Sequence, residues 1–387
     1  MPRADSPIRT GASFDPPCAM EKVPMIDFAE LVTTVLTSGA SDLHLSVGAP
    51  PVMRRSGELV PIGNHVMTAQ DTRDVIYGIL TQEQRQRLET NLEIDFSYQI
   101  PNRARFRVNA YYQRAAMGAA FRVVPSELKS LDELNLPGSI REWTTKPRGL
   151  VLVTGPTGSG KSTTLAALID DINSNRSCHI ITIEDPIEFL HKHKRSLINQ
   201  RELGGDTHSF GNALRSALRQ DPDVILVGEM RDLETIQIAL TAAETGHLVF
   251  GTLHTSDAPQ TVDRVIDVFP PHQQEQVRIM LANALQGVCC QQLLPTVHGS
   301  RVVSVEVLMA TPAVRNLIRE GKTHQIYSML QTGSQHGMIS MDASLANLVR
   351  QGVITKHLAL ERASSPGELK RLLEGGAPGS ITERKAA

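Results

Sequence analysis

Residues 150–164 read LVLVTGPTGSGKSTT, an apolar run that leads into a glycine-rich loop and then into a helix-forming segment. Within this stretch, Gly155 to Ser162 match the pattern G-x-x-x-x-G-K-[ST] in its strand–loop–helix context. Glycines let backbone N–H groups converge on phosphate oxygens, and the N-terminus of the following helix adds partial positive charge. The stretch therefore predicts a phosphate-binding loop in an α/β domain, which sets the class of ligand.

The polar residues of this loop have distinct expected roles. Lys161 is placed to reach the outer phosphates of a nucleotide, and the hydroxyl of Ser162 is a ligand for Mg²⁺. Backbone and side-chain contacts to the nucleotide are expected from the whole loop: Gly155, Pro156, Thr157, Gly158, Ser159, Gly160, Lys161, Ser162 and Thr163.

Length and composition limit the other possibilities. The chain has 387 residues, enough for about two domains. A net charge of −2 disfavours a general nucleic-acid-binding protein, which would usually be basic. No stretch approaches the roughly 18 consecutive apolar residues of a membrane-spanning helix, and no secretory signal is visible. The four cysteines form no C-x-x-C pair, which favours a reduced, cytoplasmic chain without a zinc site.

The first third of the chain predicts a small mixed domain. Residues 1–24 are rich in Pro, Ser, Ala and Gly and are predicted to be a disordered extension. Residues 25–125 are predicted to form an α+β domain. Its expected helices begin near Ile26 and lie within 69–90, and its expected strands lie at 43–47, 51–54, 94–98, 105–113 and 117–124.

Residues 126–148 contain several prolines and are predicted to be a linker with a short helix. Residues 149–375 form the second predicted domain. Apolar strands alternate there with helices, which indicates a parallel sheet buried on both faces, at 150–154, 179–183, 223–227 and 247–253. Beyond about residue 258 the domain is predicted to be helical (272–294, 312–320, 322–331 and 340–351). Residues 301–309 are a candidate for one more strand. Residues 376–387 are predicted to be a frayed tail.

Hydrolysis of a bound nucleotide needs a metal ligand, a group that aligns water and positive charge near the γ-phosphate. The segment from Glu184 to Glu188 reads EDPIE and directly follows a predicted strand. Carboxylates at the carboxyl end of such a strand face the ligand crevice. Glu188 is therefore the candidate for activating water, with Glu184 and Asp185 supporting it or the metal. The alternative is a solvated acidic turn.

Two further strands end in candidate residues. Residues 223–232 read DVILVGEMRD, and Glu229 is assigned to Mg²⁺, with a helix-start acid as the alternative. Residues 246–255 read GHLVFGTLHT, in which His254 is placed to sense the γ-phosphate and His247 precedes the strand. A histidine beside a strand is as often structural. Arginines on the strands of the first domain are candidates either for an arginine finger or for surface charge: Arg105, Arg107, Arg114 and Arg122.

The four segments, in this order and spacing, resemble the secretion ATPase superfamily, whose members power type II secretion and type IV pili. The segment SDLHLSVGAPP at 41–51 resembles the PilT-like twitching-motility ATPases in particular. The segment AVRNLIRE at 313–320 matches their AIRNLIRE motif except at Val314. The absence of a tetracysteine motif and of long additional N-terminal domains favours this branch over the assembly ATPases.

The resemblance implies a PAS-like N-terminal domain, a RecA-like ATPase core and a hexameric ring. It implies that Lys161 is the Walker A lysine, Glu229 the Walker B acid and Glu188 the catalytic glutamate. It assigns His247 and His254 to a conserved histidine segment of the family, and Arg107 and Arg122 to contacts with nucleotide, with Arg105 as a weaker candidate. The helix at 313–320 is then the element needed for retraction rather than for hydrolysis.

The implied function is that of a Mg²⁺-dependent ATPase that drives pilus retraction from the cytoplasmic side of the inner membrane. The implied partners are further copies of the chain, a PilC-like platform protein and a PilU-like paralogue, with no nucleic acid. A PilU-like accessory ATPase and a pilus-assembly or type II secretion ATPase remain alternatives. So does a regulator that binds nucleotide without turnover.

Overall fold

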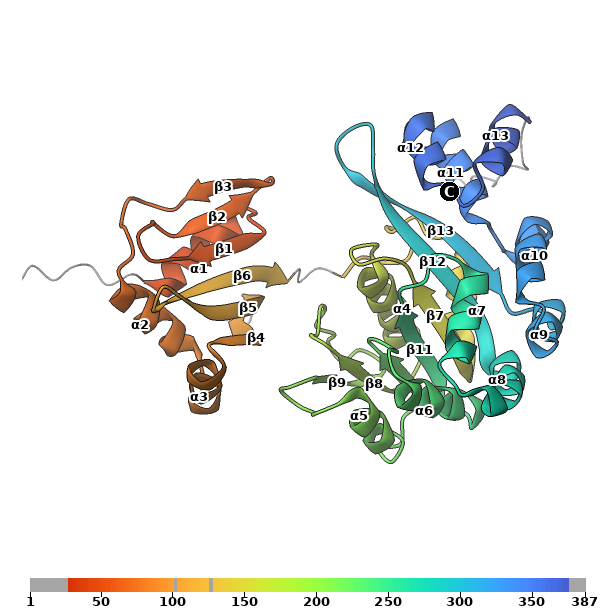
Figure 1. The fold of residues 1–387 in the computed structure, drawn as a ribbon, viewed down its shortest axis with the longest axis horizontal. Helices are drawn as coiled ribbons and strands as arrows, with labels where there is room; N and C mark the ends of the chain where they lie inside the picture. Colours follow the sequence, from red (N-terminus) through yellow and green to blue (C-terminus); the bar gives the residue numbers. More distant parts are fainter. Residues whose placement is uncertain (1–26, 101–102, 125–127, 376–387) are drawn as a thin grey trace, which may run out of the picture. The chain divides into compact units, whose positions relative to one another are not determined.

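The structure is a computed structural model that describes residues 27–100, 103–124 and 128–375. The predicted extension at 1–24 and the predicted tail at 376–387 lie outside the described residues. The described chain forms two compact units, drawn in Figure 1. The first comprises residues up to Tyr98 together with Phe106–Val123, and the second comprises the remainder.

The first unit is a six-stranded sheet with three helices. The strand order is β3-β2-β1-β6-β5-β4, and β1 pairs antiparallel with both β2 and β6. Its helices are α1 (Phe28–Thr37), α2 (Ala69–Ile79) and α3 (Gln82–Asn91). Its strands are β1 (Asp42–Leu45), β2 (Val52–Arg55), β3 (Glu58–Pro61), β4 (Glu93–Ile100), β5 (Ala104–Gln113) and β6 (Ala116–Val124). The helices and strands predicted for this region are confirmed.

Local signals in the sequence explain these elements. The tight turn between β2 and β3 uses Ser56 and Gly57, both with positive φ, as a two-residue hairpin requires. Thr68 and Thr81 begin α2 and α3 with capping boxes. The apolar face of α1 is buried, and Phe28 lies 5.3 Å from Phe121 of β6, ring centre to ring centre.

The second unit is built on a seven-stranded sheet in the order β13-β12-β7-β11-β10-β8-β9. All neighbouring pairs are parallel except β12 with β13. The strands are β7 (Gly149–Thr154), β8 (His179–Glu184), β9 (Leu197–Glu202), β10 (Val224–Val227), β11 (Leu248–Leu253), β12 (Leu285–Pro295) and β13 (Arg301–Met309). The predicted parallel strands of this domain are confirmed.

Helices connect and cover these strands. They are α4 (Lys161–Asn175), α5 (Phe210–Ala217), α6 (Leu233–Glu244), α7 (Ala258–Asp267), α8 (Pro271–Ala284), α9 (Pro312–Arg319), α10 (Ile326–Thr332), α11 (Met341–Arg350), α12 (Lys356–Arg362) and α13 (Pro366–Glu374). In Figure 1 the last helices of the chain, α11, α12 and α13, gather as a group beside the long hairpin of β12 and β13.

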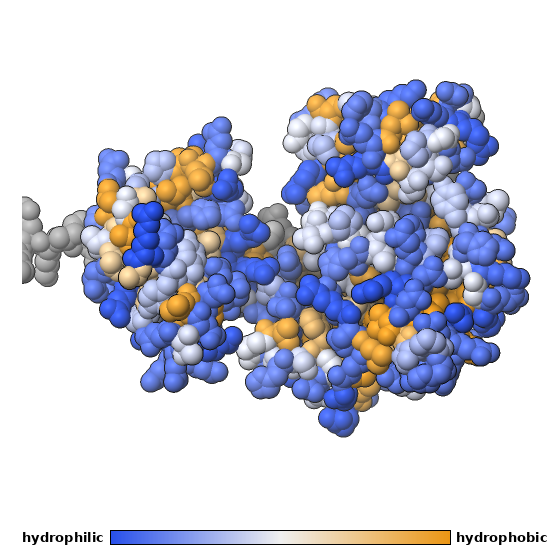
Figure 2. All heavy atoms as spheres, viewed as in Figure 1, coloured by the Kyte–Doolittle hydropathy of each residue, from blue (hydrophilic) through white to orange (hydrophobic). Residues whose placement is uncertain are grey.

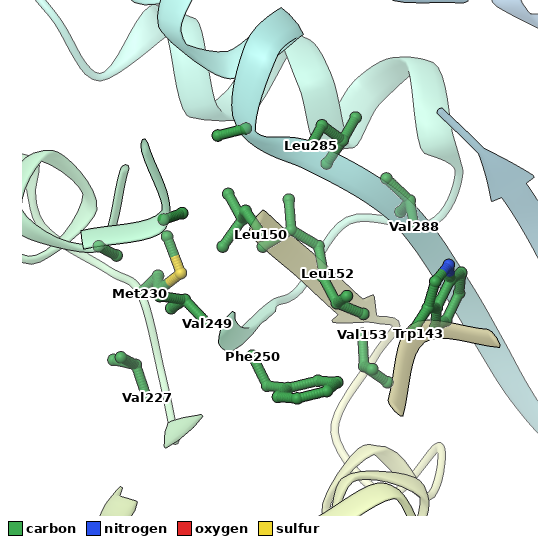
Figure 3. Packing of buried hydrophobic residues seen from close by; sticks show 14 of the residues in the cluster. Trp143, Leu150, Leu152, Val153, Val227, Met230, Val249, Phe250, Leu285 and Val288 are labelled. Carbon is green, nitrogen blue, oxygen red and sulfur yellow. The ribbon is translucent and has the colours of Figure 1, made fainter. Parts of the chain in front are cut away.

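The central strands are apolar on both faces, as the sequence predicts. Every residue of β7, β10 and β11 is buried. Figure 3 shows Leu150 and Leu152 of β7 packed among Phe250, Leu285 and Val288. This rigid core fixes the ends of the central strands relative to one another.

One predicted helix is correct only in its first half. The sequence predicts a helix over 272–294, but α8 ends at Ala284 and residues 285–295 form β12, which pairs with β7 on one side and β13 on the other. The residues of β12 are mostly buried, and a short apolar run has the same appearance in a buried strand as in a buried helix. The candidate strand at 301–309 is confirmed as β13.

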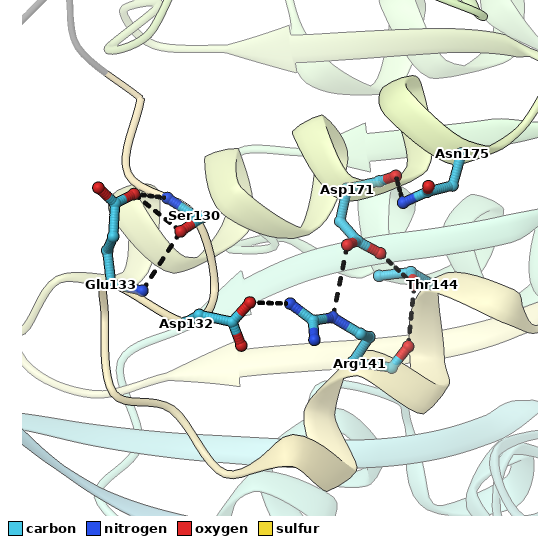
Figure 4. Close-up of polar contacts among 7 residues, drawn as sticks. All are labelled: Ser130, Asp132, Glu133, Arg141, Thr144, Asp171 and Asn175. Atoms are coloured by element: carbon cyan, nitrogen blue, oxygen red, sulfur yellow. Dashed lines mark hydrogen bonds and ion pairs between the residues drawn. The ribbon is translucent and has the colours of Figure 1, made fainter. Parts of the chain in front are cut away.

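The predicted linker is more ordered than expected. Its short helix is a 3₁₀ helix over Gly138–Thr145, in which Trp143 is fully buried in the core of the second unit. Figure 4 shows Arg141 of this helix paired with Asp132 and with Asp171 of α4. The hydroxyl of Thr144 also donates to Asp171, at 2.7 Å. These contacts attach residues 130–145 to α4, the helix that follows the glycine-rich loop.

The surface seen in Figure 2 is mainly hydrophilic, with separate apolar patches. Large exposed apolar side chains include Leu59, Val66, Leu92 and Leu197. Among the described residues, no helix is both long enough and apolar enough to cross a membrane.

Candidate active site

The candidate residues of the second unit gather because four neighbouring strands run in the same direction. Strands β7, β11, β10 and β8 are adjacent and parallel. At their carboxyl ends lie, in turn, the glycine-rich loop, His254, Glu229 and the segment from Glu184 to Glu188. This edge of an open parallel sheet is where α/β proteins bind ligands.

The glycine-rich loop has little room at its first residue. Gly155 has φ of +135°, and a Cβ atom there would lie 2.3 Å from the backbone oxygen of Gln291 on β12. Only glycine fits this position. The side chain of Gln291 is buried and donates to the Thr164 hydroxyl of α4 at 2.8 Å. Strand β12 therefore supports both the loop and the first turn of the helix after it.

The loop ends where α4 begins at Lys161. Gly160 precedes this helix in a left-handed conformation, and no side chain caps the helix, so its first N–H groups point into the loop. The Lys161 ammonium donates to the carbonyls of Gly155 at 2.8 Å and Pro156 at 3.1 Å. Partial burial lowers its pKa, which the negative charge of Glu229 opposes. The ammonium thus lies over the loop, within electrostatic reach of the Glu229 carboxylate.

Glu229 is held by a histidine and an arginine. His254 Nε2 lies 2.6 Å from Glu229 Oε1, and the Arg231 guanidinium pairs with the same oxygen. Burial opposes ionisation of Glu229, but hydrogen bonds from Arg231 and His254 leave its pKa below the usual value. Asp232, not Glu229, is the N-cap of α6. The interpretation of Glu229 as a helix-start acid is therefore excluded.

Gly228 allows the close approach of Glu229 to the neighbouring strand. Its N–H donates to the Ile183 carbonyl of β8 at 2.7 Å, and a Cβ atom there would lie 3.0 Å from that oxygen. A glycine before the acid therefore lets the end of β10 lie directly against the end of β8.

The carboxylates after β8 differ in exposure. Burial raises the pKa of Glu184, which accepts from the Thr182 hydroxyl at 2.6 Å and from Gln200 at 3.2 Å. The backbone N–H of Glu188 also hydrogen bonds to it. Glu184 therefore positions the turn, whereas the Glu188 side chain is exposed at the ligand-facing edge. The assignment of Glu188 to water activation stays a prediction.

His247 is not brought to this edge. It precedes β11, at the opposite end of the strand from His254, and its Nδ1 lies 3.0 Å from the Ala242 carbonyl. Its backbone carbonyl accepts from Gly149, the first residue of β7. A contact between His247 and nucleotide bound at the loop of the same chain has no support in this position, and its assignment stays a prediction.

Three of the four candidate arginines lie on strands, whereas Arg114, predicted on a strand, lies in the turn between β5 and β6. Arg107 is exposed on β5, and Arg122 on β6 donates to Asp42 at 2.9 Å. Arg105 clusters with the second unit, where it pairs with Glu202. The roles of Arg107 and Arg122 toward nucleotide also stay predictions.

Sequence reasoning missed two residues of this site. Gln291 lies in a segment predicted to be helical, so nothing indicated that it supports the glycine-rich loop. Arg231 lies in the DVILVGEMRD segment, where a basic residue two positions after the acid was a visible signal without an assigned role.

The donor atoms at this edge fit a magnesium ion. The Ser162 side chain is exposed in the first turn of α4, and the low pKa of Glu229 keeps its carboxylate ionised. Both are oxygen donors, and Mg²⁺ in nucleotide sites is usually held by one or two such groups together with phosphates and water. Ser162 and Glu229 are thus the residues that would hold it.

Comparison with known proteins agrees with this arrangement. Residues 21–307 match the family model of the type II/IV secretion system proteins. The chain is 52% identical to the type IV pilus retraction ATPase PilT of Pseudomonas aeruginosa, over 88% of this chain and 99% of that protein. It is 39% identical to the type IV pilus ATPase PilU of the same organism, over 91% and 92% of the two chains.

Among solved structures, the chain is similar to the pilus retraction motor PilT crystallised with bound ADP. The TM-score is 0.85, with 48% identity over 89% of this chain and 99% of that one. Sequence and fold agree over most of both molecules. The chain is therefore an ATPase that belongs to the type II/IV secretion system protein family.

Proposed function

We propose that this chain is the motor that drives retraction of type IV pili, and with it twitching motility. The observation that carries this proposal is the 52% identity to PilT over nearly the whole of that protein. The lower identity to PilU favours a retraction motor over an accessory ATPase of that kind. The first unit would be the PAS-like domain and the second the RecA-like core, with domains at 25–125 and 149–375.

Each group at the sheet edge has a proposed task in hydrolysis. Lys161 and the N–H groups of the loop would hold the phosphates, while Ser162 and Glu229 would hold Mg²⁺, which would supply positive charge to neutralise the phosphates. Glu188 orients and deprotonates the attacking water. His254 reports the state of the γ-phosphate to Glu229, since the two side chains share a hydrogen bond.

The proposed assembly is a homo-hexameric ring at the cytoplasmic face of the inner membrane, below the pilus. Arg107 and Arg122 would add positive charge to a nucleotide between subunits. Loss of the γ-phosphate would then release one rigid unit from another. The ring would pass this motion to a PilC-like platform protein, with a PilU-like paralogue as a further partner.

The helix α9 is the proposed contact for retraction. Val314 and Ile318 of this helix are buried, and the Arg315 guanidinium is bonded to the end of α8. Only the other face is free to meet a partner: Ala313, Asn316, Arg319 and Glu320 are exposed there.

Steady-state phosphate release by the purified full-length chain tests the ATPase site. Lys161→Ala should reduce the rate to background, because the outer phosphates lose their cation. Lys356→Ala, an exposed lysine at the start of α12, is the matched control and should leave the rate unchanged. Hydrolysis by Lys161→Ala at the wild-type rate would contradict the site. Nucleotide binding without turnover by the wild type would instead favour the regulator.

A further inference from the structure

A buried acid, Glu306, lies outside the proposed catalytic groups. It is on β13, opposite Cys290 of β12, and its side chain is fully buried. A carboxylate is rarely buried without a specific partner, because it loses its hydration. The partners of Glu306 therefore indicate what it does.

Both oxygens of this carboxylate accept from the start of a helix. Oε1 accepts from the N–H of Ala258, the first residue of α7, at 2.8 Å. Oε2 accepts from the N–H of Met341, the first residue of α11, at 3.3 Å. The N-cap residues of these helices bond to later N–H groups, so these two would otherwise lack a partner. Glu306 thus joins the beginnings of two helices to one strand.

The first of these helices continues directly from the nucleotide edge. Only Thr255, Ser256 and Asp257 separate His254 from Ala258. The Thr255 hydroxyl lies 2.7 Å from the hydroxyl of Thr261 in α7, which ties this short loop to the helix. A shift of Ala258 would therefore move His254, whose ring contacts Glu229.

The second helix belongs to the C-terminal helical group. Met341 and Leu345 of α11 pack in a small core with Leu369 of α13. Next to Met341, Asp342 accepts from the Tyr327 hydroxyl of α10 at 2.9 Å and from the N–H of Ser365 before α13. The start of α11 is therefore fixed to the helices on either side of it.

We infer that Glu306 is a positioning residue for ATP hydrolysis, which holds the His254 loop in place and couples it to the C-terminal helices through the N–H groups of Ala258 and Met341. The inference rests on the proposed role of His254 and Glu229. In the part of the chain that the structure describes, the Glu306 side chain hydrogen bonds to Ala258 and Met341 and to none of the proposed nucleotide-binding residues, so it acts through the loop.

Glu306→Gln is the direct test, because the amide keeps one acceptor oxygen and loses the other. We expect kcat for phosphate release to fall on the order of tenfold, with KM for ATP unchanged, since the phosphate loop is untouched. Ser304→Ala is the matched control. Ser304 is buried two residues earlier on β13 and bonds to Ser344 of α11 at 3.0 Å, with no bond to α7. It should lose stability without losing kcat.

Hydrogen exchange of the wild-type chain gives a second test that does not depend on a variant that folds. Binding of a non-hydrolysable ATP analogue should change exchange at Ala258 and at Met341 in the same direction. A change at Ala258 alone, or a wild-type kcat in a folded Glu306→Gln chain, would overturn the inference. If wild type hydrolyses no ATP, or Glu229→Gln has no effect, the proposed function fails instead.

Discussion

Glu229 supplies a negative charge to the proposed site. Its carboxylate contacts His254 and Arg231 and lies near Lys161. Glu229→Gln should lower the rate of ATP hydrolysis by about 100-fold or more, because a neutral amide is a poor ligand for Mg²⁺ and loses the ion pair with Arg231. Phosphate release measures the rate, and titration with a fluorescent nucleotide should show that binding is largely retained.

The matched control for this change is Glu244→Gln. Glu244 is an exposed acid in the last turn of α6, which leads into the start of β11, the end of that strand opposite His254. Its substitution should leave the rate at the wild-type value. Equal rates in the two variants would remove Glu229 from the mechanism.

Glu306 makes stability depend on pH. Burial raises its pKa from 4.5 to about 7, with further contributions from Asp257, the N-cap of α7, and Asp342 on α11. Between these pH values the unfolded chain has lost a proton that the folded chain retains. The contribution of Glu306 to the free energy of unfolding therefore falls as pH rises from 4.5 to 7.

Glu306→Gln removes this titration. The free energy of unfolding of the variant, relative to wild type, should rise by up to about 3 kcal/mol between pH 5 and pH 8. Urea unfolding of both chains at the two pH values measures this difference. A difference that does not change with pH would show that the acid is ionised throughout.

Single residues also show where sequence reasoning was limited. The glycine-rich loop, the acid Glu229 and the histidine His254 were visible in the sequence because each follows an apolar strand. Neighbouring parallel strands then bring these residues to the same edge of the sheet. The support from Gln291 was not visible, because it comes from a strand mistaken for a helix. The position of His247 before β11 was visible in the sequence, whereas its assignment to nucleotide came only from the family resemblance and stays a prediction.

Among the elements, the glycine-rich loop has little room for a side chain at its first residue. Gly155→Ala places a methyl group against the Gln291 carbonyl and strains a positive φ, so nucleotide affinity and melting temperature should both fall. Gly158→Ala has the same sign of φ but open space around it. It should lower the melting temperature less, which calorimetry measures. Equal losses would mean that the contact with β12 is unimportant.

The helix α9 is attached to α8 by two arginines, of which Arg315 makes the more buried contacts. Arg315 donates to the carbonyls of Ala282 and Asn283 at 2.6 Å each, where a cation also complements the helix dipole. Arg315→Ala should cost about 2 kcal/mol of unfolding free energy, because carbonyls at the end of α8 lose a charged donor. Arg319→Ala should cost less, about 0.5 kcal/mol, because Arg319 donates to the Asn283 side chain of α8 at 3.1 Å from an exposed position. Similar losses in urea unfolding would contradict this role of Arg315.

For helices and strands, the sequence predicts which elements form better than it predicts where each element begins and ends. The parallel strands were visible as apolar runs, and α2 and α3 had clear capping signals. The boundary between α8 and β12 carries no proline, and its glycine, Gly287, already lies within β12, so the apolar pattern runs through Ala284 without a break. The burial of Trp143 in the predicted linker was also hidden, because proline-rich composition does not report tertiary packing.

For the whole molecule, the central claim is retraction rather than extension, and ATP chemistry is common to both. The most direct measurement is deletion of the gene in a piliated host, complemented with wild type or with Lys161→Ala, with surface pili counted and twitching scored. We predict excess surface pili without twitching in the deletion strain, restored by wild type but not by Lys161→Ala. Cells without pili would contradict the account and indicate an assembly motor.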